Sequence, residues 1–163
     1  MQMIEADIMD ADLVGYIHST AWKQAYNEMF PIEYLEEDTP QMRTNEFLEA
    51  CNNNGINYYI IYEDEIAVGI VKVIFEVNKV CEISSFYILK EYRNRGYGRQ
   101  VIAYVSDVLC QQCIYLWVLA DNVKARRFYE NNGFVLTGNI REINRGIRCR
   151  QLQYVREKVI ALL

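Results

Sequence analysis

A basic glycine loop at residues 93–98, with the sequence Arg-Asn-Arg-Gly-Tyr-Gly, constrains the fold of this chain more than any other stretch. Apolar residues 83–89 precede the loop and predict a strand, and a helical pattern follows from near Arg99. Glycines let the main chain approach an anion closely, and successive N–H groups and a helix N-terminus can bind it. The order of these elements predicts a phosphate-binding turn between a strand and a helix.

Two well-known glycine loops do not fit these residues. A dinucleotide-binding G-x-G-x-x-G loop needs glycine at position 101, where Val101 stands, and the G-x-x-x-x-G-K-[ST] spacing of a P-loop is absent. The loop instead resembles the [QR]-x-x-G-x-[GA] signature of the GNAT superfamily of acyl-CoA-dependent N-acyltransferases. Arg93, Gly96 and Gly98 stand at the fixed positions of that signature.

A second segment, residues 122–134, strengthens this resemblance. Asn122 is a natural N-cap, and Gly133 can take the left-handed conformation that ends a helix. The helix face between them carries Ala125, Phe128 and Tyr129. The segment is similar to the GNAT pattern N-x-x-A-x-x-[FY]-Y-x-x-x-G-F, and it follows the glycine loop in the order typical of the superfamily. Through these two motifs the chain is identified as a member of the superfamily.

Length, charge and cysteine usage limit the remaining possibilities. With 163 residues, 52% of them hydrophobic, the chain predicts one domain over residues 1–163 with a substantial core. A net charge of −5 argues against nucleic acid or an anionic membrane as a partner and favours a cationic substrate. The five cysteines are irregularly spaced, and no signal peptide or bilayer-spanning run is evident, so we expect a reduced, cytoplasmic protein. No metal site is expected, because the pair Cys110 and Cys113 lacks a second pair and the chain has one histidine, His18.

The apolar pattern predicts the order of the elements. Strands are expected at residues 1–6, 57–62, 66–75, 83–89, 114–119, 136–143 and 148–155, and helices from about residue 10, at 32–36, at 41–51, after the glycine loop and at 122–133. The continuous apolar run 114–119 is typical of a strand covered on both faces. A strand, a helix and a strand in succession predict a parallel pair. The fold class is therefore α/β (α+β). The resemblance implies a GNAT-like domain with a mixed, mostly antiparallel sheet, a central parallel pair splayed at the cofactor site, and helices on both faces.

The resemblance also implies acetyl-CoA as the co-substrate and names the residues that would bind it. Main-chain amides before the loop would hold the pantetheine and the acyl carbonyl, and loop amides would hold the pyrophosphate with added arginine charge. Asn122 would bind the cofactor arm. The cofactor-binding candidates are Phe86, Tyr87, Ile88, Arg93, Asn94, Arg95, Gly96, Tyr97, Gly98, Arg99, Asn122 and Tyr129.

Two residues are candidates for acid and base chemistry, because acyl transfer needs a proton for the departing thiolate and a neutral attacking amine. By its place in the second motif Tyr129 would protonate the coenzyme A sulfur, although a tyrosine on an amphipathic helix is often a core residue. Glu82 lies eleven residues before Arg93, as the basic glutamate of histone-acetyltransferase members does. A water chain as the base, with Glu82 as a structural partner, is the alternative.

The acceptor is expected to be a primary amine of a small cationic molecule or of a peptide. In the superfamily the N-terminal helices and the last hairpin select it, so Trp22, Tyr26, Tyr34 and Tyr154 could line its pocket or belong to the core. His18 and the acidic residues 33–38 are better explained as packed or solvated side chains, and the arginines of the last hairpin as exposed positions. A non-catalytic acyl-CoA-binding sensor or interaction module is the alternative function, a purely structural protein is a third, and a homodimer through the last strands is possible.

Overall fold

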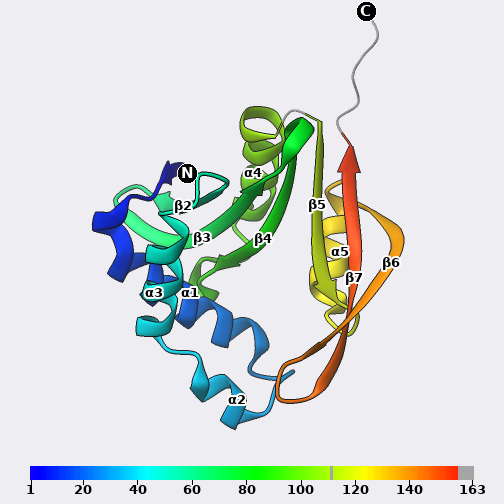
Figure 1. The fold of residues 1–163 in the computed structure, drawn as a ribbon, viewed down its shortest axis with the longest axis horizontal. Helices are drawn as coiled ribbons and strands as arrows, with labels where there is room; N and C mark the ends of the chain where they lie inside the picture. Colours follow the sequence, from blue (N-terminus) through cyan, green and yellow to red (C-terminus); the bar gives the residue numbers. More distant parts are fainter. Residues whose placement is uncertain (111, 158–163) are drawn as a thin grey trace, which may run out of the picture.

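The computed structural model describes residues 1–110 and 112–157, and the strands in this part of the chain form one seven-stranded sheet in the order β1-β2-β3-β4-β5-β7-β6 (Figure 1). The strands are β1 (Gln2–Glu5), β2 (Ile56–Glu63), β3 (Ile66–Phe75), β4 (Val80–Ile88), β5 (Cys113–Leu119), β6 (Val135–Asn144) and β7 (Arg148–Glu157). The α-helices are α1 (Ala11–Tyr26), α2 (Ile32–Glu37), α3 (Pro40–Ala50), α4 (Tyr97–Tyr104) and α5 (Val123–Asn131). The predicted order of elements is confirmed, with α4 starting two residues before Arg99.

Helices cover both faces of the sheet. Successive residues of a strand point to opposite faces, and in β2 the side chains on both faces are apolar and buried. In β2, Tyr58 and Ile60 are buried in a cluster with residues of α1 and α3. The intervening Tyr59 and Ile61 are buried in a second cluster with residues of α4. The prediction of a mixed sheet with helices on both faces is therefore confirmed. None of the helices in the described residues is long and apolar enough to span a membrane.

The central parallel pair, β4 and β5, separates after three residue pairs. Register partners run from Val80 with Cys113 to Glu82 with Tyr115, and all other paired strands in the sheet are antiparallel. Beyond Glu82, β4 stays paired with β3 as far as Ile88, and β5 stays paired with β7 as far as Leu119. The sheet thus opens between β4 and β5, as the resemblance implied (Figure 1).

An irregularity in β4 lies where this opening begins. Val73 of β3 pairs with Ile83, but the preceding Lys72 pairs with Ser85, so Ser84 is an extra residue in β4. Such a bulge bends its strand and turns side chains and main-chain groups to new directions. The bulge therefore helps to bend β4 away from β5.

The expectation that β5 is covered on both faces is wrong. Ile114, Leu116 and Val118 are buried against the α4 side, but Tyr115 and Trp117 alternate with them and are only half-buried. The physical reason is the separation of β4 and β5, which leaves the second face of β5 along the opening. Its apolar residues there form a wall instead of a core layer.

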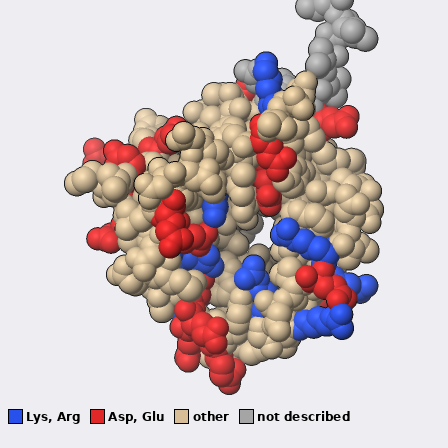
Figure 2. Space-filling model, viewed as in Figure 1, with Lys and Arg blue, Asp and Glu red and all other residues tan. Residues whose placement is uncertain are grey.

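The turn between β6 and β7 closes the far end of the opening by touching α2. A side chain at Gly146, whose φ is 74°, would place its Cβ 2.8 Å from the Cβ of Tyr34. Nη1 of Arg145 donates a hydrogen bond to the Tyr34 hydroxyl at 3.0 Å. An aromatic cluster that includes Trp22 and Phe30 packs beside this contact. The molecule therefore encloses a hollow between its two halves, visible near the centre of Figure 2.

Candidate active site

The largest pocket near the opening, which we call the cofactor pocket, has a volume of about 690 Å³ and lies between the glycine loop and α5. Side chains of β4, the glycine loop and α5 form its walls. They are Phe86, Ile88, Tyr92, Arg93, Asn94, Gly96, Tyr97, Gly98, Arg99, Ala125, Phe128, Tyr129, Asn131 and Asn132. Nine of the residues predicted from the sequence to bind cofactor are therefore brought together here.

The main chain of the glycine loop is shaped by two left-handed residues. Asn94 has a φ of 62° and Gly96, immediately before α4, a φ of 83°. The first N–H groups of any α-helix have no acceptor within the helix, so those of α4 remain available to an anion. Gly98 is needed for a different reason, since a Cβ there would lie 2.9 Å from the ring of Phe128. Close contact between the loop and α5 thus requires glycine at position 98.

The three arginines of this region have different environments. Arg93 donates from Nε to the Ile88 carbonyl at 2.8 Å and from Nη2 to the Ala21 carbonyl at 3.4 Å, so it joins the end of β4 to α1. Arg95 forms an ion pair with Glu63 at 3.1 Å and does not line the cofactor pocket. Arg99 is exposed, lines the pocket and forms no ion pair among the described residues. Arg99 is therefore better placed than Arg95 to add positive charge to the cofactor pocket.

A narrow pocket of about 160 Å³ continues from the cofactor pocket into the opening between β4 and β5. Phe86, Ala125 and Tyr129 line both spaces, and Asn122 and Tyr87 line the narrow one. Oδ1 of Asn122 accepts a hydrogen bond from the Ala125 amide at 3.0 Å, which confirms Asn122 as the N-cap of α5. The side-chain amide nitrogen of Asn122 is not used by this cap.

Tyr129 lies where the cofactor pocket and the narrow pocket meet. Burial, and to a smaller extent the nearby Tyr26, raises the pKa of Tyr129 well above its ordinary value. The hydroxyl therefore stays protonated throughout the physiological range. A protonated phenol at this junction can donate a hydrogen bond to a group in either space.

A third space, which we call the acceptor pocket, has a volume of about 220 Å³ and lies on the α1 and α3 side of the sheet. It shares Tyr26, Ser84, Ser85, Tyr87 and Trp117 with the narrow pocket. Its complete lining is His18, Trp22, Tyr26, Phe30, Arg43, Glu46, Glu82, Ser84, Ser85, Tyr87, Trp117, Leu119, Arg141, Ile143, Arg145 and Gln151. The three spaces therefore adjoin one another in a row through the opened sheet.

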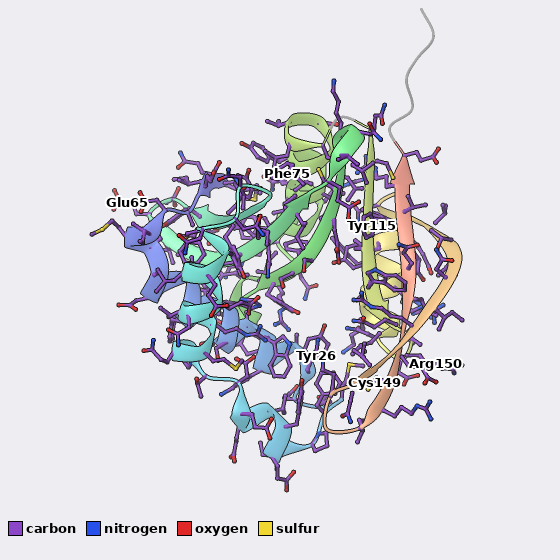
Figure 3. All side chains as sticks on the ribbon, in the orientation of Figure 1. Tyr26, Glu65, Phe75, Tyr115, Cys149 and Arg150 are labelled. Atoms are coloured by element: carbon purple, nitrogen blue, oxygen red, sulfur yellow. The ribbon has the colours of Figure 1, made fainter. Side chains whose placement is uncertain are left out.

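Glu82 is the last residue of β4 that pairs with β5, and its side chain lines the acceptor pocket. Its Oε2 lies 3.2 Å from the Tyr115 hydroxyl, whose one proton is shared between Glu82 and the closer carboxylate of Glu76, at 2.5 Å. No cation among the described residues forms an ion pair with Glu82. Figure 3 shows Tyr26 on the α1 side of the opening and Tyr115 on the β5 side. The carboxylate of Glu82 is thus free to take a proton from a group bound in the pocket.

On the α3 side of the acceptor pocket, a network of ion pairs holds the carboxylate of Glu46 in place. Glu46 accepts from Lys72 at 2.8 Å and from Arg43 at 2.7 Å, and Arg43 also contacts Asp38 at 2.5 Å. Burial raises the pKa of Glu46, but the hydrogen bonds and charges of Lys72 and Arg43 outweigh burial and lower it to about 2. Glu46 is therefore an ionised structural group.

His18 lies in this wall as an uncharged side chain. It is 1% exposed, its ring stacks on Tyr87 with centroids 5.5 Å apart, and its Nδ1 has no hydrogen-bond partner among the described residues. Burial, with a smaller contribution from the charge of Arg43, lowers its pKa to about 3. The expectation of a packed histidine agrees with this burial, although the side chain also lines the acceptor pocket.

The last hairpin supplies two arginines to the acceptor pocket. Arg141 of β6 extends over β7, where its Nε donates to Oε1 of Gln151 at 2.7 Å, and its guanidinium carbon lies 4.4 Å from the centre of the Trp117 ring on β5. Arg145 reaches the pocket from the turn. Both are exposed, as predicted, but their place beside the N-terminal helices was not predicted.

Of the four aromatic residues considered for the acceptor from the sequence, two line the acceptor pocket and two do not. Tyr154 is fully buried and its hydroxyl donates to Glu130 at 2.6 Å, so it belongs to the core. Tyr34 packs against Trp22 and holds the hairpin turn. The carboxylates of α2 are exposed, whereas Asp38 is buried against Arg43. Trp22 and Tyr26 line the acceptor pocket.

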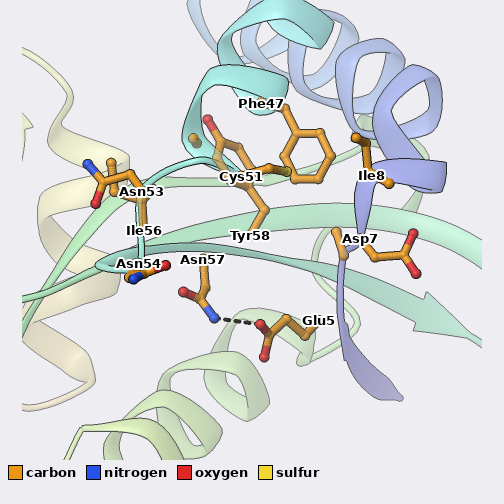
Figure 4. Close-up of a pocket in the computed structure, with 12 residues that line it drawn as sticks. Glu5, Asp7, Ile8, Phe47, Cys51, Asn53, Asn54, Ile56, Asn57 and Tyr58 are labelled. Carbon is orange, nitrogen blue, oxygen red and sulfur yellow. Dashed lines mark hydrogen bonds between the residues drawn. The ribbon is translucent and has the colours of Figure 1, made fainter.

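A further pocket of about 410 Å³ lies beside β1 and α3 (Figure 4). It shares no lining residue with the three spaces described above. At its edge, Nδ2 of Asn57 donates to Oε1 of Glu5 at 2.6 Å. Among the described residues no group of three potential metal ligands comes together. Gln111, within the Cys110 to Cys113 segment, lies outside the described residues.

Comparison with known proteins agrees with this arrangement. The model of the acetyltransferase (GNAT) family matches residues 19–134. The uncharacterized N-acetyltransferase YuaI of Bacillus subtilis (strain 168) is 23% identical over 128 residues, which cover 72% of this chain and 71% of that protein.

Two solved structures show the same fold. The PaiA N-acetyltransferase of Thermoplasma acidophilum in complex with coenzyme A has a TM-score of 0.77 and 16% identity, covering 96% of this chain and 98% of that one. The spermidine N-acetyltransferase of Vibrio cholerae in complex with CoA and spermine has a TM-score of 0.73 and 18% identity, covering 96% and 94%. The family match covers well over half of the chain, and the chain therefore belongs to the GNAT family of N-acetyltransferases.

Proposed function

We propose that this protein transfers the acetyl group of acetyl-CoA to a primary amine within a ternary complex, through one acetyltransferase domain spanning residues 1–163. The observation that carries the proposal is the row of three adjoining spaces through the opened sheet. The cofactor pocket lies beside α4 and α5, and the acceptor pocket lies beside α1 and α3. Two substrates can therefore reach the opening from opposite faces without displacing each other.

The main chain of β4 supports the binding of an acyl-CoA in the opening. In an antiparallel strand, alternate residues direct their N–H and C=O groups toward opposite neighbours. Beyond Glu82, the groups of β4 that point away from β3 have no strand partner, because pairing with β5 has ended. We assign these groups, at Phe86 to Ile88, to the pantetheine and the thioester carbonyl. The first turn of α4, the loop and Arg99 would hold the phosphates.

The proposed reaction uses one residue on each side of the thioester. The amine nitrogen attacks the thioester carbon, so a C–N bond forms and the C–S bond breaks. Glu82, directly or through water, takes the proton that the amine loses. Tyr129 donates its hydroxyl proton to the departing sulfur and regains one from solvent. The raised pKa of Tyr129 keeps the hydroxyl protonated before the reaction, so a hydrogen-bond donor faces the sulfur when negative charge develops on it.

The acceptor is a primary amine of a small molecule or a peptide. The named activity of the spermidine N-acetyltransferase neighbour supports a small amine, and the acceptor pocket of about 220 Å³ suits one. A homodimer and a cytoplasmic location stay predictions. Edge strand β6, which exposes Val135, Leu136 and Ile140, is the surface on which a dimer would be sought.

Mass-spectrometric detection of acetyl transfer from acetyl-CoA tests the proposal. The acceptor panel contains amino acids, polyamines, aminoglycosides, and peptides with free N-termini or lysines. We expect transfer to one class of acceptor, strongly reduced in Tyr129→Phe. If acetyl-CoA raises the melting temperature but no acceptor on the panel is acetylated, the non-catalytic acyl-CoA sensor replaces the enzyme. If acetyl-CoA does not bind, the assignment of the glycine loop is wrong.

A further inference from the structure

The acceptor pocket is rich in basic side chains although the protein is acidic. The whole chain has a net charge of −5. The charged residues that line the pocket are three arginines and two carboxylates, namely Arg43, Arg141, Arg145, Glu46 and Glu82. Figure 2 shows basic side chains beside and below the hollow between the two halves of the molecule, with acidic ones above it and over α2. The charge of the pocket lining is therefore opposite in sign to the net charge of the chain, which indicates that the pocket binds a group with negative charge.

The two carboxylates of the pocket differ in what they can still bind. Glu46 is already paired with both Arg43 and Lys72, so its charge is matched within the protein. Glu82 accepts a hydrogen bond from Tyr115, an uncharged group, and forms no ion pair with any described residue. Glu82 is therefore the carboxylate of this pocket that is left to attract an amine.

Arg141 and Arg145 likewise keep unused binding capacity. Neither forms an ion pair within the described part of the chain. Each donates one side-chain hydrogen bond to an uncharged group, Arg141 to Gln151 and Arg145 to the Tyr34 hydroxyl. A guanidinium has five N–H donors in a planar fork that matches a carboxylate. Two guanidinium groups with N–H donors left over in one pocket indicate an anionic group on the ligand.

Arg141 is also held in place before any ligand arrives. Its guanidinium lies over the ring of Trp117, and its Nε is fixed by Gln151 on the neighbouring strand. A pre-oriented guanidinium loses less side-chain freedom when it binds a carboxylate. This arrangement distinguishes Arg141 from a solvated surface arginine.

We propose that the acceptor is a small amino acid-like zwitterion, whose amine lies at Glu82 and whose carboxylate is bound by Arg141 and Arg145. The inference rests on the proposed function and names its substrate class. The volume of about 220 Å³ is below that of a site for a drug-sized ligand, roughly 300 to 1,000 Å³. A polyamine would bring further positive charge to two unpaired guanidinium groups, and such like-charge contact is unfavourable.

The test compares each of the twenty L-amino acids with its own carboxamide, which keeps the amine and loses the negative charge. We expect at least one free amino acid to be acetylated with a kcat/KM about 10- to 100-fold above that of its carboxamide, as the loss of a charge-assisted hydrogen bond implies. In Arg141→Gln the preference should fall to a few-fold at most, mainly through KM. Spermidine should be acetylated no better than the best amino acid.

Arg150→Gln is the matched control, because Arg150 belongs to the same hairpin, is exposed and does not line the acceptor pocket. Figure 3 shows Arg150 on the outer side of the hairpin, away from the opening. This variant should keep the wild-type preference. If Arg141→Gln lowers the melting temperature, the preference for the acid over the carboxamide is measured in Arg145→Gln instead. Equal rates for acids and carboxamides, faster reaction of spermidine, or acetylation of peptides but not of free amino acids would each overturn the proposal.

Failure of the proposed function can be told apart from failure of this inference. If no compound is acetylated, calorimetric binding of the same amino acids and carboxamides to the protein saturated with coenzyme A still tests the pocket. Tighter binding of the acids than of the carboxamides, lost in Arg141→Gln, would support the carboxylate site without catalysis. Equal or absent binding of both would refute it.

Discussion

The cofactor pocket and the acceptor pocket lie in the same opening of the sheet but are assembled in opposite ways. The cofactor pocket takes its residues from two short segments, 86–99 and 125–132, and depends on main-chain shape and a close glycine contact. The acceptor pocket takes its residues from helices and strands spread over positions 18 to 151, and it depends on charged side chains. A pocket built from contiguous residues is readable in a sequence, whereas one built by tertiary assembly is not.

Tyr129→Phe should have the largest effect, because Tyr129 lies at the boundary between the two regions. Loss of a positioned acid typically costs about 10²- to 10⁴-fold in rate. We expect kcat to fall within that range while the Kd for acetyl-CoA stays within about two-fold, a margin well below one hydrogen bond. Stopped-flow or steady-state kinetics with parallel calorimetry would measure both quantities.

Tyr16→Phe is the control for this change, since Tyr16 is 56% exposed and lines none of the three spaces. It should behave as wild type. Full activity in Tyr129→Phe would remove Tyr129 from the chemistry and leave its hydroxyl with a packing role only.

Glu82→Gln should affect the acceptor side alone. Removing the base should lower kcat/KM for the amine by about 10²-fold, the lower end of the usual range because water can replace a carboxylate in part. The remaining activity should rise more steeply with pH than that of the wild type, because only the amine that is already neutral can attack. A pH-rate profile between pH 6 and 10 would show this change.

Glu76→Gln tests whether Glu82 acts through its own carboxylate or only by holding the Tyr115 hydroxyl in place. Glu76 accepts from the same Tyr115 hydroxyl but lines none of the three spaces. If Glu76→Gln and Glu82→Gln reduce the rate equally, the position of Tyr115 is what matters, and a water chain takes the place of Glu82 as base.

Gly98→Val should affect the cofactor side alone. Its Cβ would lie 2.9 Å from the ring of Phe128, so the loop and α5 must move apart. Overpacking of this kind costs about 1 to 3 kcal/mol of stability. If movement of the loop relieves that strain, the Kd for acetyl-CoA should rise by up to roughly 150-fold, the equivalent of the same free energy. Calorimetric titration with acetyl-CoA would measure the change.

The comparison for Gly98→Val is Gly96→Ala, where the added Cβ meets nothing within 4 Å but φ is 83°. That substitution should lower the free energy of unfolding by about 1 kcal/mol, through main-chain strain. It should change the Kd less than Gly98→Val does. The reverse order of the two Kd values would show that the loop, and not its contact with α5, sets cofactor affinity.

Glu46→Gln should produce the smallest change, and in stability instead of chemistry. The folded pKa of about 2 lies below the usual 4.5, so Glu46 stabilises the fold above pH 4.5, and this contribution is lost as the pH falls toward 2. We expect the variant to be less stable by about 2 kcal/mol at pH 7, after allowance for partial exposure of the carboxylate. Urea unfolding at several pH values would show the difference from wild type shrinking below pH 4.5.

Glu49→Gln, on the exposed side of the same helix, is the control for Glu46→Gln and should leave stability unchanged. A difference between wild type and Glu46→Gln that is constant with pH would mean that packing, and not the ion pairs with Arg43 and Lys72, accounts for the loss.

The sequence predicted the cofactor pocket better than the acceptor pocket, because the cofactor pocket comes from short segments of the chain. Gly96 acts through its own φ and Asn122 through a hydrogen bond to Ala125, so their roles were visible in local patterns. Gly98 was found through its place in the glycine-loop signature, although the residue it contacts, Phe128, lies on α5. The apolar alternation placed the strands within a few residues. The extra residue Ser84 was not predicted, because a bulge depends on the register with β3.

The residues of the acceptor pocket that were not predicted also depend on tertiary contacts. Trp117 was assigned to a covered strand, but its exposure depends on the separation of β4 and β5. Arg141 and Arg145 looked like ordinary hairpin positions, and their meeting with α1 and α3 depends on the closure of the turn onto Tyr34. None of these events leaves a periodic or spaced pattern in the chain.

The early separation of β4 and β5 has a consequence for the life of the protein as well as for its chemistry. Beyond the three register pairs, β4 and β5 share no ladder of hydrogen bonds, and the proposed ligand would bind main-chain groups that a neighbouring strand leaves unpaired. Ligand binding is then linked to folding, and at a hundred times its Kd it adds about 2.7 kcal/mol to the free energy of unfolding. We therefore expect the protein without a ligand to unfold at a lower temperature, and to be cleaved faster by proteases, than the protein with acetyl-CoA bound.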